Sequence, residues 1–211
     1  GGACAAVTRA NEDSIYYVLK GSGTAQYGGK DMAMKAGAFM SVTAPVRAPL
    51  KSASGFTVVV MGFHTEGFPT DPLPPGPLKA NLADVPPQHV GRHPDSTLYR
   101  LMLGDSAQKR DKIDAGRVVT SLFLMEIDPS GTNFPHHHPR EEEIYLVLDG
   151  HGDQVAGSGT DGIAARFPAG PGDAYYYRAN ATVGYYSAPN VKSRILCIRS
   201  WQPGLQPGSG K

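Results

Sequence analysis

The chain of 211 residues has little cysteine, little net charge and no long hydrophobic run. Its two cysteines, Cys4 and Cys197, lie far apart without a pairing pattern, which favours free buried thiols over a disulfide. The formal net charge is +1 and no basic run occurs, so nothing indicates binding to nucleic acid or to an anionic membrane. No apolar stretch approaches the roughly 18 residues of a transmembrane helix, and no signal peptide is recognisable. We expect a soluble protein of unknown compartment, with the cytoplasm slightly favoured.

Glycine, proline and apolar residues are, in contrast, abundant. The chain contains 26 glycines and 18 prolines, and 40% of its residues are hydrophobic. Many turns combined with enough apolar residues for a core are typical of an all-β protein. A chain of this length forms one large domain or two small ones.

The residues that can carry chemistry are concentrated between residues 131 and 150. Three consecutive histidines are bracketed by prolines, which exclude a helix there. Side chains alternate between the two faces of an extended strand, so His136 and His138 point one way and His137 the other. The second proline can turn the chain, so that a following carboxylate folds back toward the imidazoles. Two imidazoles and one carboxylate are the ligand set of non-haem iron sites, and they also serve catalytic zinc.

The spacing of these residues resembles the first conserved motif of the cupin family, which consists of small jelly-roll β-barrels. The motif is carried by Gly131, the pair His136 and His138, Glu143 and Gly150, together with the apolar strand after Glu143. The resemblance implies that His136, His138 and Glu143 are metal ligands. It also implies one divalent ion, which could be Fe, Mn, Zn, Ni or Cu. The expected fold is all-β, with two antiparallel jelly-roll (cupin) β-barrels.

The second barrel is expected because the chain contains an internal repeat. Residues 14–21 read SIYYVLKG and align with residues 143–150, which read EIYLVLDG. Glycines that open a later strand, Gly37 and Gly172, extend the repeat. The chain thus resembles the bicupins. The first copy lacks the chemistry, because the equivalents of the three metal ligands are Val7, Arg9 and Ser14.

The repeat sets the expected domain organisation. Residues 1–66 form an N-terminal barrel without metal ligands, and residues 97–202 form the metal-binding barrel. The proline-rich segment 67–96 is predicted to be a linker on the surface, and residues 203–211 a flexible tail. The linker histidines, including His93, are interpreted as solvated loop residues.

The first copy starts almost at the position of its missing histidines, whereas the second has a strand at 118–127 before them. Missing opening strands would leave an unpaired sheet edge. Either residues upstream of Gly1 are absent from this chain, or a strand from elsewhere completes the sheet. Because cupin barrels commonly pair, we expect a homodimer. The expected partner is otherwise a small-molecule ligand or substrate, with no nucleic acid and no membrane.

The later part of the active copy departs from the family pattern. Cupins usually supply a fourth ligand, a histidine, from a later strand, and the equivalent position here is Val183. Three consequences remain open. The site could work with three ligands and a wider open face, it could recruit a tyrosine such as Tyr185, or it could bind metal poorly.

Two functions compete on this basis. The first is a metal-dependent enzyme of dioxygenase, isomerase or lyase type acting on a small polar molecule, in which the metal polarises a carbonyl or activates oxygen. The second is a non-catalytic cupin that binds a sugar or another small ligand, with the metal structural. Glu142 and Arg178, together with Tyr185, are the candidate catalytic residues beside the metal ligands, and Glu141 is a further candidate to orient the ligands or bind a substrate carboxylate.

Overall fold

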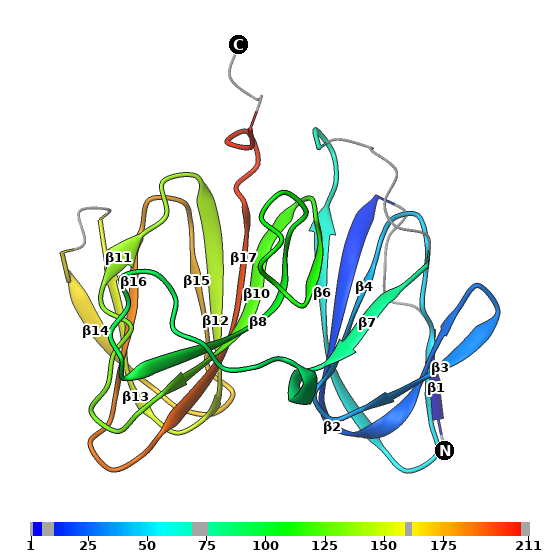
Figure 1. The fold of residues 1–211 in the computed structure, drawn as a ribbon, viewed down its shortest axis with the longest axis horizontal. Coiled ribbons are helices and arrows are strands. Elements are labelled where there is room, and N and C mark those ends of the chain that lie inside the picture. Colours follow the sequence, from blue (N-terminus) through cyan, green and yellow to red (C-terminus); the bar gives the residue numbers. More distant parts are fainter. Residues whose placement is uncertain (1, 6–10, 69–75, 159–161, 208–211) are drawn as a thin grey trace.

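The computed structural model describes residues 2–5, 11–68, 76–158 and 162–207, which form the two lobes seen in Figure 1. The predicted all-β class is confirmed, and the described residues contain no α-helix. Their one helical element is the 3-10 turn η1 (Leu82–Asp84), which begins after Asn81, whose side chain accepts a hydrogen bond from the backbone of Ala83. No described helix has the length and hydropathy needed to cross a membrane.

The N-terminal lobe is built around one long strand, β2, which pairs with four others. The lobe is a single seven-stranded sheet that is not closed into a barrel by strand pairing. Its strands are β1 (Gly2–Cys4), β2 (Glu12–Tyr27), β3 (Lys30–Lys35), β4 (Ala38–Val42), β5 (Leu50–Ser52), β6 (Phe56–His64) and β7 (Leu78–Asn81).

The C-terminal lobe consists of two sheets that face each other across a hydrophobic core. The six-stranded sheet has the order β15-β12-β17-β10-β8-β9, and the four-stranded sheet the order β11-β16-β13-β14. The larger sheet contains β8 (Thr97–Asp105), β9 (Ile113–Gly116), β10 (Val119–Ile127), β12 (Glu141–Asp149), β15 (Ala174–Tyr177) and β17 (Ser193–Trp201). The smaller one contains β11 (His136–His137), β13 (Gly152–Gly157), β14 (Ala165–Ala169) and β16 (Thr182–Ser187).

The internal repeat of the sequence reappears as a repeat of strand pairing. In the N-terminal lobe β2 pairs with β4 and β6, just as β12 pairs with β15 and β17 in the C-terminal lobe. Residues 14–17 pair with β4, and the aligned residues 143–146 pair with β15. The ladders with β6 and β17 both shift register directly after aligned valines, Val18 and Val147. The two copies therefore share a local irregularity as well as a strand order.

The six-stranded sheet is buried on both faces at β10, and this joins the lobes. Along β10, Leu122 and Leu124 pack in a core cluster with Ile15 of β2, whereas Phe123 and Met125 belong to the core of the C-terminal lobe. Burial of each such side chain stabilises the fold by about 1.5–3 kcal/mol. The near-continuous apolar sequence of β10 follows from this position, because a strand covered on both faces has no solvent side.

An ion pair reinforces the same interface. Arg117, directly before β10, donates two hydrogen bonds of 2.7 Å to the carboxylate of Asp13 in β2. Asp13 also accepts a hydrogen bond from the backbone of Ala44. Both charged side chains are largely removed from water, with exposed fractions of 15% and 11%. The bidentate geometry fixes how the N-terminal sheet sits on the C-terminal lobe.

Some segments differ in detail from the sequence-based expectations. Within the predicted linker at 67–96, β7 (Leu78–Asn81) forms an edge strand of the N-terminal sheet, so this sheet continues past residue 66. The strand has no internal proline, and its edge position suits a proline-rich surrounding. In the predicted tail at 203–211, residues up to 207 are described, and Arg140 donates to two tail carbonyls. The ligand-lacking positions Val7 and Arg9 lie outside the described residues.

Both cysteines are free, as expected, but only one is buried. Cys197 lies in the core of the C-terminal lobe, where burial holds the pKa of its thiol well above the usual range. Cys4 is exposed on β1. The expectation of two buried thiols is therefore wrong for Cys4, because β1 is a short edge strand with exposed residues.

Candidate metal centre

The candidate site begins with the loop that connects β10 to β11, and Asn133 anchors this loop. The Asn133 side chain is fully buried, donates to the hydroxyl of Tyr145 at 2.9 Å and accepts from the backbone N–H of Tyr185 at 2.8 Å. The loop is thereby attached to β12 and β16 together. Phe134 follows with a φ of 56°, a left-handed conformation that turns the chain toward His136.

Strand pairing then sets the directions of the histidines. The short strand β11 pairs with β16, in a register that places His136 opposite Val183 and His137 opposite Thr182. Val183, the position where the family pattern has a fourth ligand, is therefore a direct neighbour of His136 across the sheet. It is only 1% exposed and belongs to the hydrophobic core.

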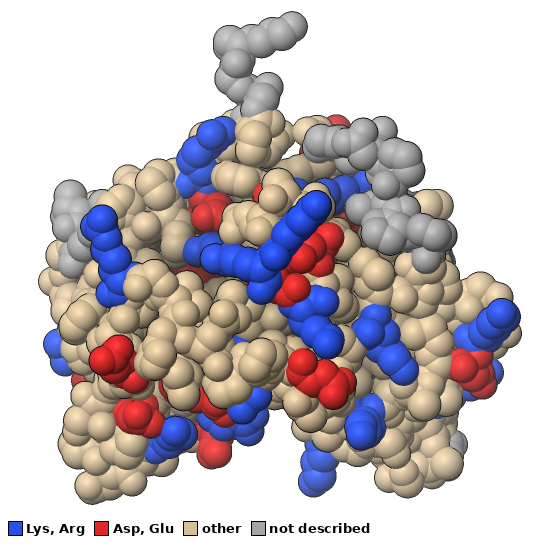
Figure 2. All heavy atoms as spheres, in the orientation of Figure 1, with Lys and Arg blue, Asp and Glu red and all other residues tan. Residues whose placement is uncertain are grey.

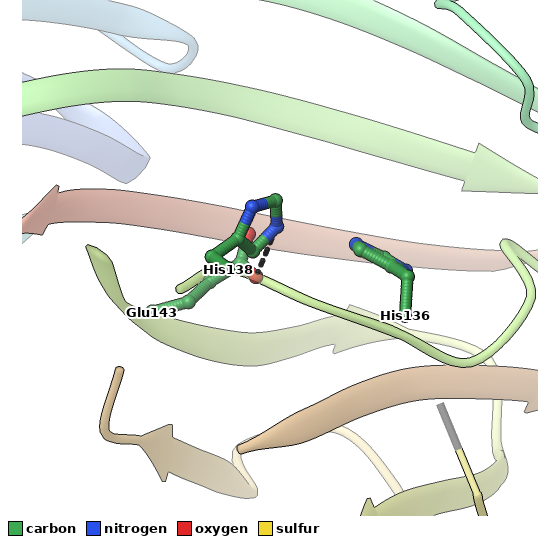
Figure 3. A group of neighbouring side chains, drawn as sticks. All are labelled: His136, His138 and Glu143. Atoms are coloured by element: carbon green, nitrogen blue, oxygen red, sulfur yellow. Dashed lines mark ion pairs between the residues drawn. The ribbon is translucent and has the colours of Figure 1, made fainter. Parts of the chain in front are cut away.

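Figure 3 shows that His136, His138 and Glu143 gather at one place, with the ligands coming from β11, the following turn and β12. One potential ligand atom from each residue lies within 4.8 Å of the others. The closest pair is Nε2 of His138 and Oε2 of Glu143, at 3.5 Å. Nδ1 of His136 donates to the carbonyl oxygen of Phe134 at 2.8 Å, so Nε2 is the ring nitrogen that carries the lone pair.

Glu143 is the most telling member of the cluster. It is 2% exposed, and its Oε2 atom has no hydrogen-bond partner in the described part of the chain. Burial raises the pKa of this carboxyl to about 7, although the positive charge of Arg199 acts in the opposite direction. A buried carboxylate oxygen without a partner is costly, and a bound cation removes that cost.

His138 complements this carboxylate because it is held neutral. Burial, followed by the charge of Arg199, lowers the pKa of His138 to about 2. A neutral imidazole keeps the lone pair that a metal needs. The donor set of two imidazoles and one buried carboxylate therefore fits a divalent ion.

A positively charged side chain of the protein also lies at the cluster. Arg199 lies opposite Glu143 in the ladder between β12 and β17. Its Nη1 atom is 3.2 Å from both ring nitrogens of His138, so the guanidinium lies against the ring rather than in line with one nitrogen. Its Nε atom is 3.3 Å from Glu141, whose carboxylate balances the charge. The arginine is thus available to a negatively charged group that enters beside the metal.

The space between these residues is small, with a volume of about 70 Å³. It can hold an ion and a few heavy atoms, far less than the roughly 300–1,000 Å³ of a drug-sized pocket. The larger hollows, of about 1170 and 740 Å³, lie on the open N-terminal sheet, away from the histidine cluster. The chemistry, not the size, identifies the site. The small cavity is lined by Val90, His93, Tyr99, Leu101, Arg110, Ser121, Phe123, Asn133, His136, His138, Glu143, Tyr145 and Arg199.

The three candidate catalytic residues do not line this cavity. Glu142 points away from Glu143 and accepts hydrogen bonds from Tyr176 and Ser200. Arg178 is exposed and lines a separate surface depression. Tyr185 is fully buried in the core. The structure brings the three predicted metal ligands together and leaves the predicted catalytic residues outside.

Sequence reasoning missed Arg199 and His93, which line the cavity. It did indicate Glu141, which shares a strand face with Glu143 and forms an ion pair with Arg199. Arg199 is brought in by the pairing of β17 with β12, and His93 by the path of the linker. Neither has a local sequence signal, because both depend on tertiary placement.

Comparisons with known proteins agree with this fold. The cupin domain family model matches residues 123–199, which include all three candidate ligands and Arg199. No curated protein matches the sequence. The match supports a cupin domain in the C-terminal lobe.

Solved structures similar to the chain differ widely in name. A protein of Pseudomonas aeruginosa described as glyoxylate-induced has a TM-score of 0.70 at 17% identity, over 90% of this chain and 66% of its own. Oxalate decarboxylase of Lactobacillus farciminis, solved with formate, has a TM-score of 0.69 at 15% identity, over 96% of this chain and 74% of its own. Hazelnut (Corylus avellana) vicilin has a TM-score of 0.59 at 11% identity, over 90% of this chain and 69% of its own. The chain spans just under two thirds of the Pseudomonas protein. At these identities the likeness shows the cupin fold alone.

Proposed function

We propose that the chain is a metal-dependent cupin enzyme of dioxygenase, isomerase or lyase type that acts on a small polar molecule. In this proposal the chain is a bicupin, and His136, His138 and Glu143 of the C-terminal lobe hold one divalent ion. The observation that carries the proposal is the buried Oε2 atom of Glu143, without a hydrogen-bond partner among the described residues, beside a neutral His138. When bound, the metal supplies Lewis-acid or oxygen-activating chemistry.

The residues around the ligands favour an anionic substrate. Arg199 and Arg110 both line the cavity, and the guanidinium of Arg199 is in position to pair with a carboxylate beside His138. Glu141 lies 3.3 Å from the Nε atom of Arg199 and balances part of its charge. The cavity of about 70 Å³ restricts the substrate to few heavy atoms. A small carboxylate or keto acid fits these limits, and the oxalate decarboxylase among the neighbours acts on a molecule of that class.

The experiment starts from protein purified without added metal. We expect about one equivalent of a divalent ion by elemental analysis, and turnover of a small carboxylate in screens that follow oxygen uptake and product formation. His138→Ala should lose the metal and the activity, because it removes the imidazole that lies closest to the buried carboxylate of Glu143. His151→Ala, at an exposed histidine of the same lobe, is the matched control and should keep both. A full equivalent of metal in His138→Ala would contradict the ligand assignment.

A second candidate, a non-catalytic cupin that binds a small ligand, is favoured by one observation. Arg199 lies 3.2 Å from His138, and its positive charge opposes a metal at the same place. If this repulsion prevails, carboxylates bind to the purified protein in calorimetry, with an affinity that metal removal does not change. Binding that disappears with the metal supports the enzyme instead.

The proposal also includes the partners of the chain. Figure 2 shows acidic and basic side chains interspersed on the face that it draws, which favours a small-molecule partner over a nucleic acid or a membrane. We expect a homodimer, because the open N-terminal sheet leaves strand edges for a second copy. Light scattering at micromolar concentration tests this, and a monomer would contradict it.

A further inference from the structure

The linker contributes a third histidine to the cavity. His93 precedes β8 and lines the cavity together with the three candidate ligands. We propose that His93 is a fourth protein ligand of the metal, supplied by the linker because the later strand carries Val183. This inference rests on the proposed metal site.

The first support is the way in which the His93 ring is held. Its Nδ1 atom lies 2.8 Å from the carbonyl oxygen of Asn133. The Nδ1 atom of His136 lies at the same distance from the carbonyl oxygen of the next residue, Phe134. Two consecutive carbonyl groups of one loop thus orient two imidazoles in the same manner. A backbone carbonyl that accepts from one ring nitrogen and leaves the other for the metal is the usual arrangement of ligating histidines.

The second support is the spacing of the rings. An imidazole nitrogen binds a divalent ion at about 2.1 Å, so two rings on one ion at angles of about 90° to 110° have centres about 4.5–5.3 Å apart. The centres of His136 and His138 are 5.0 Å apart, with the planes at 88°. Those of His93 and His136 are also 5.0 Å apart, with the planes at 74°. Both pairs have the spacing of ligands to a common ion.

The third support concerns Val183, which stands where the family pattern has its fourth ligand. Val183 sits opposite His136 in the pairing of β11 with β16 and offers only methyl groups. His93 approaches His136 from the linker instead. It is not among the residues whose ligand atoms lie within 4.8 Å of one another, so its ring must move toward the ion when metal binds. It lies on a turn outside the strands, so this movement breaks no ladder hydrogen bond.

The linker itself is well fixed around this residue. Gln88 and Tyr99 exchange backbone hydrogen bonds of 2.9 and 2.8 Å, which attach the linker to β8. The His93 ring also packs against the Tyr99 ring, at 5.1 Å between centres. Only a local adjustment of His93 is therefore needed, and metal binding would in turn hold the linker against the C-terminal lobe.

The test counts imidazoles on a bound probe metal. Cu²⁺ is a suitable probe because it binds nitrogen ligands most tightly among the divalent ions. Spin-echo modulation of bound Cu²⁺ should report three coordinated imidazoles in the unchanged protein and two in His93→Ala. Replacement of an outer residue of a metal site already costs about 10- to 100-fold in affinity, so loss of this ligand should weaken Co²⁺ binding by about 100-fold.

Control variants distinguish a wrong role for His93 from misfolding and from the absence of a metal site. His89→Ala removes an exposed histidine of the same linker and should leave the imidazole count and the affinity unchanged. His93→Gln, with the same thermal unfolding of the metal-free form as the unchanged protein, guards against misfolding. Two imidazoles in both the unchanged protein and His93→Ala would overturn the role of His93 while sparing the metal site. No metal binding by the unchanged protein would overturn the site and this inference together.

Discussion

The two copies of the repeat share a backbone but not a site. β2 and β12 each pair with two equivalent strands, with the same pairing over four residues and the same register shift. The four-stranded sheet also has a counterpart, because β1, β5, the second half of β2 and β3 pair in that order and pack across a core cluster against the first half of β2. Yet Ser14 stands where Glu143 stands. The comparison teaches that this strand arrangement is a scaffold for which metal ligands are optional, and that the chemistry depends on a few side chains.

The largest expected effect comes from breaking the ion pair between the two lobes. Arg117→Ala leaves Asp13 buried at the interface without its bidentate partner, so the free energy of unfolding should fall by about 3 kcal/mol. Urea denaturation of the metal-free protein measures this. Arg47→Ala, which removes an exposed arginine of the N-terminal lobe, serves as the control and should change stability little. An equal effect of both variants would contradict the importance of the interface ion pair.

A second prediction compares the aligned positions Glu143 and Ser14 in the metal-free protein. The folded pKa of Glu143 is about 7, above its ordinary value of 4.5, because the carboxyl is buried. Below pH 4.5 the group is neutral in both folded and unfolded chains, and as the pH rises through 7 the folded chain loses stability. Glu143→Gln should therefore be more stable than the unchanged chain above pH 7, by at most about 3 kcal/mol, with no gain below pH 4.5.

Ser14→Ala is the matched variant in the other copy. Ser14 is buried and its hydroxyl has no hydrogen-bond partner among the described residues, so a small effect without pH dependence is expected. Thermal unfolding from pH 4 to 8 in the presence of a chelator measures both. His138, whose depressed pKa costs stability as the pH falls below 6.5, is present in both variants. A pH-independent Glu143→Gln effect would contradict the buried charge.

The smallest expected effect concerns Val183, where the active copy departs from the family pattern. Val183→His adds an imidazole directly opposite His136 and should tighten metal binding by about 10-fold. It should also lower turnover, because the new ligand occupies a coordination position that the substrate needs. Metal titration and initial rates measure the two effects. A variant with tighter metal binding and faster turnover would mean that the native chain is an impaired four-ligand enzyme.

The sequence predicted the scaffold better than the site's surroundings. The all-β class and the aligned strands around Ser14 and Glu143 followed from short-range patterns of apolar residues and glycine. The convergence of the three ligands followed from alternation along a strand. Alternation also separates Glu141 from Glu142, and the predicted catalytic residue Glu142 faces away from the cavity. Arg199 could not be predicted, because the register between β12 and β17 is fixed by contacts between segments far apart in the chain.

The loop after β10 orients two imidazoles through main-chain carbonyl groups at residues 133 and 134. Every amino acid carries a carbonyl group, so residue 134 can change to any residue that tolerates a left-handed backbone without loss of this contact. Related chains that keep the anchoring side chain of Asn133 can therefore preserve the geometry of this site while the rest of the loop sequence changes. Searches for such proteins should give the backbone conformation of this turn more weight than its amino-acid sequence.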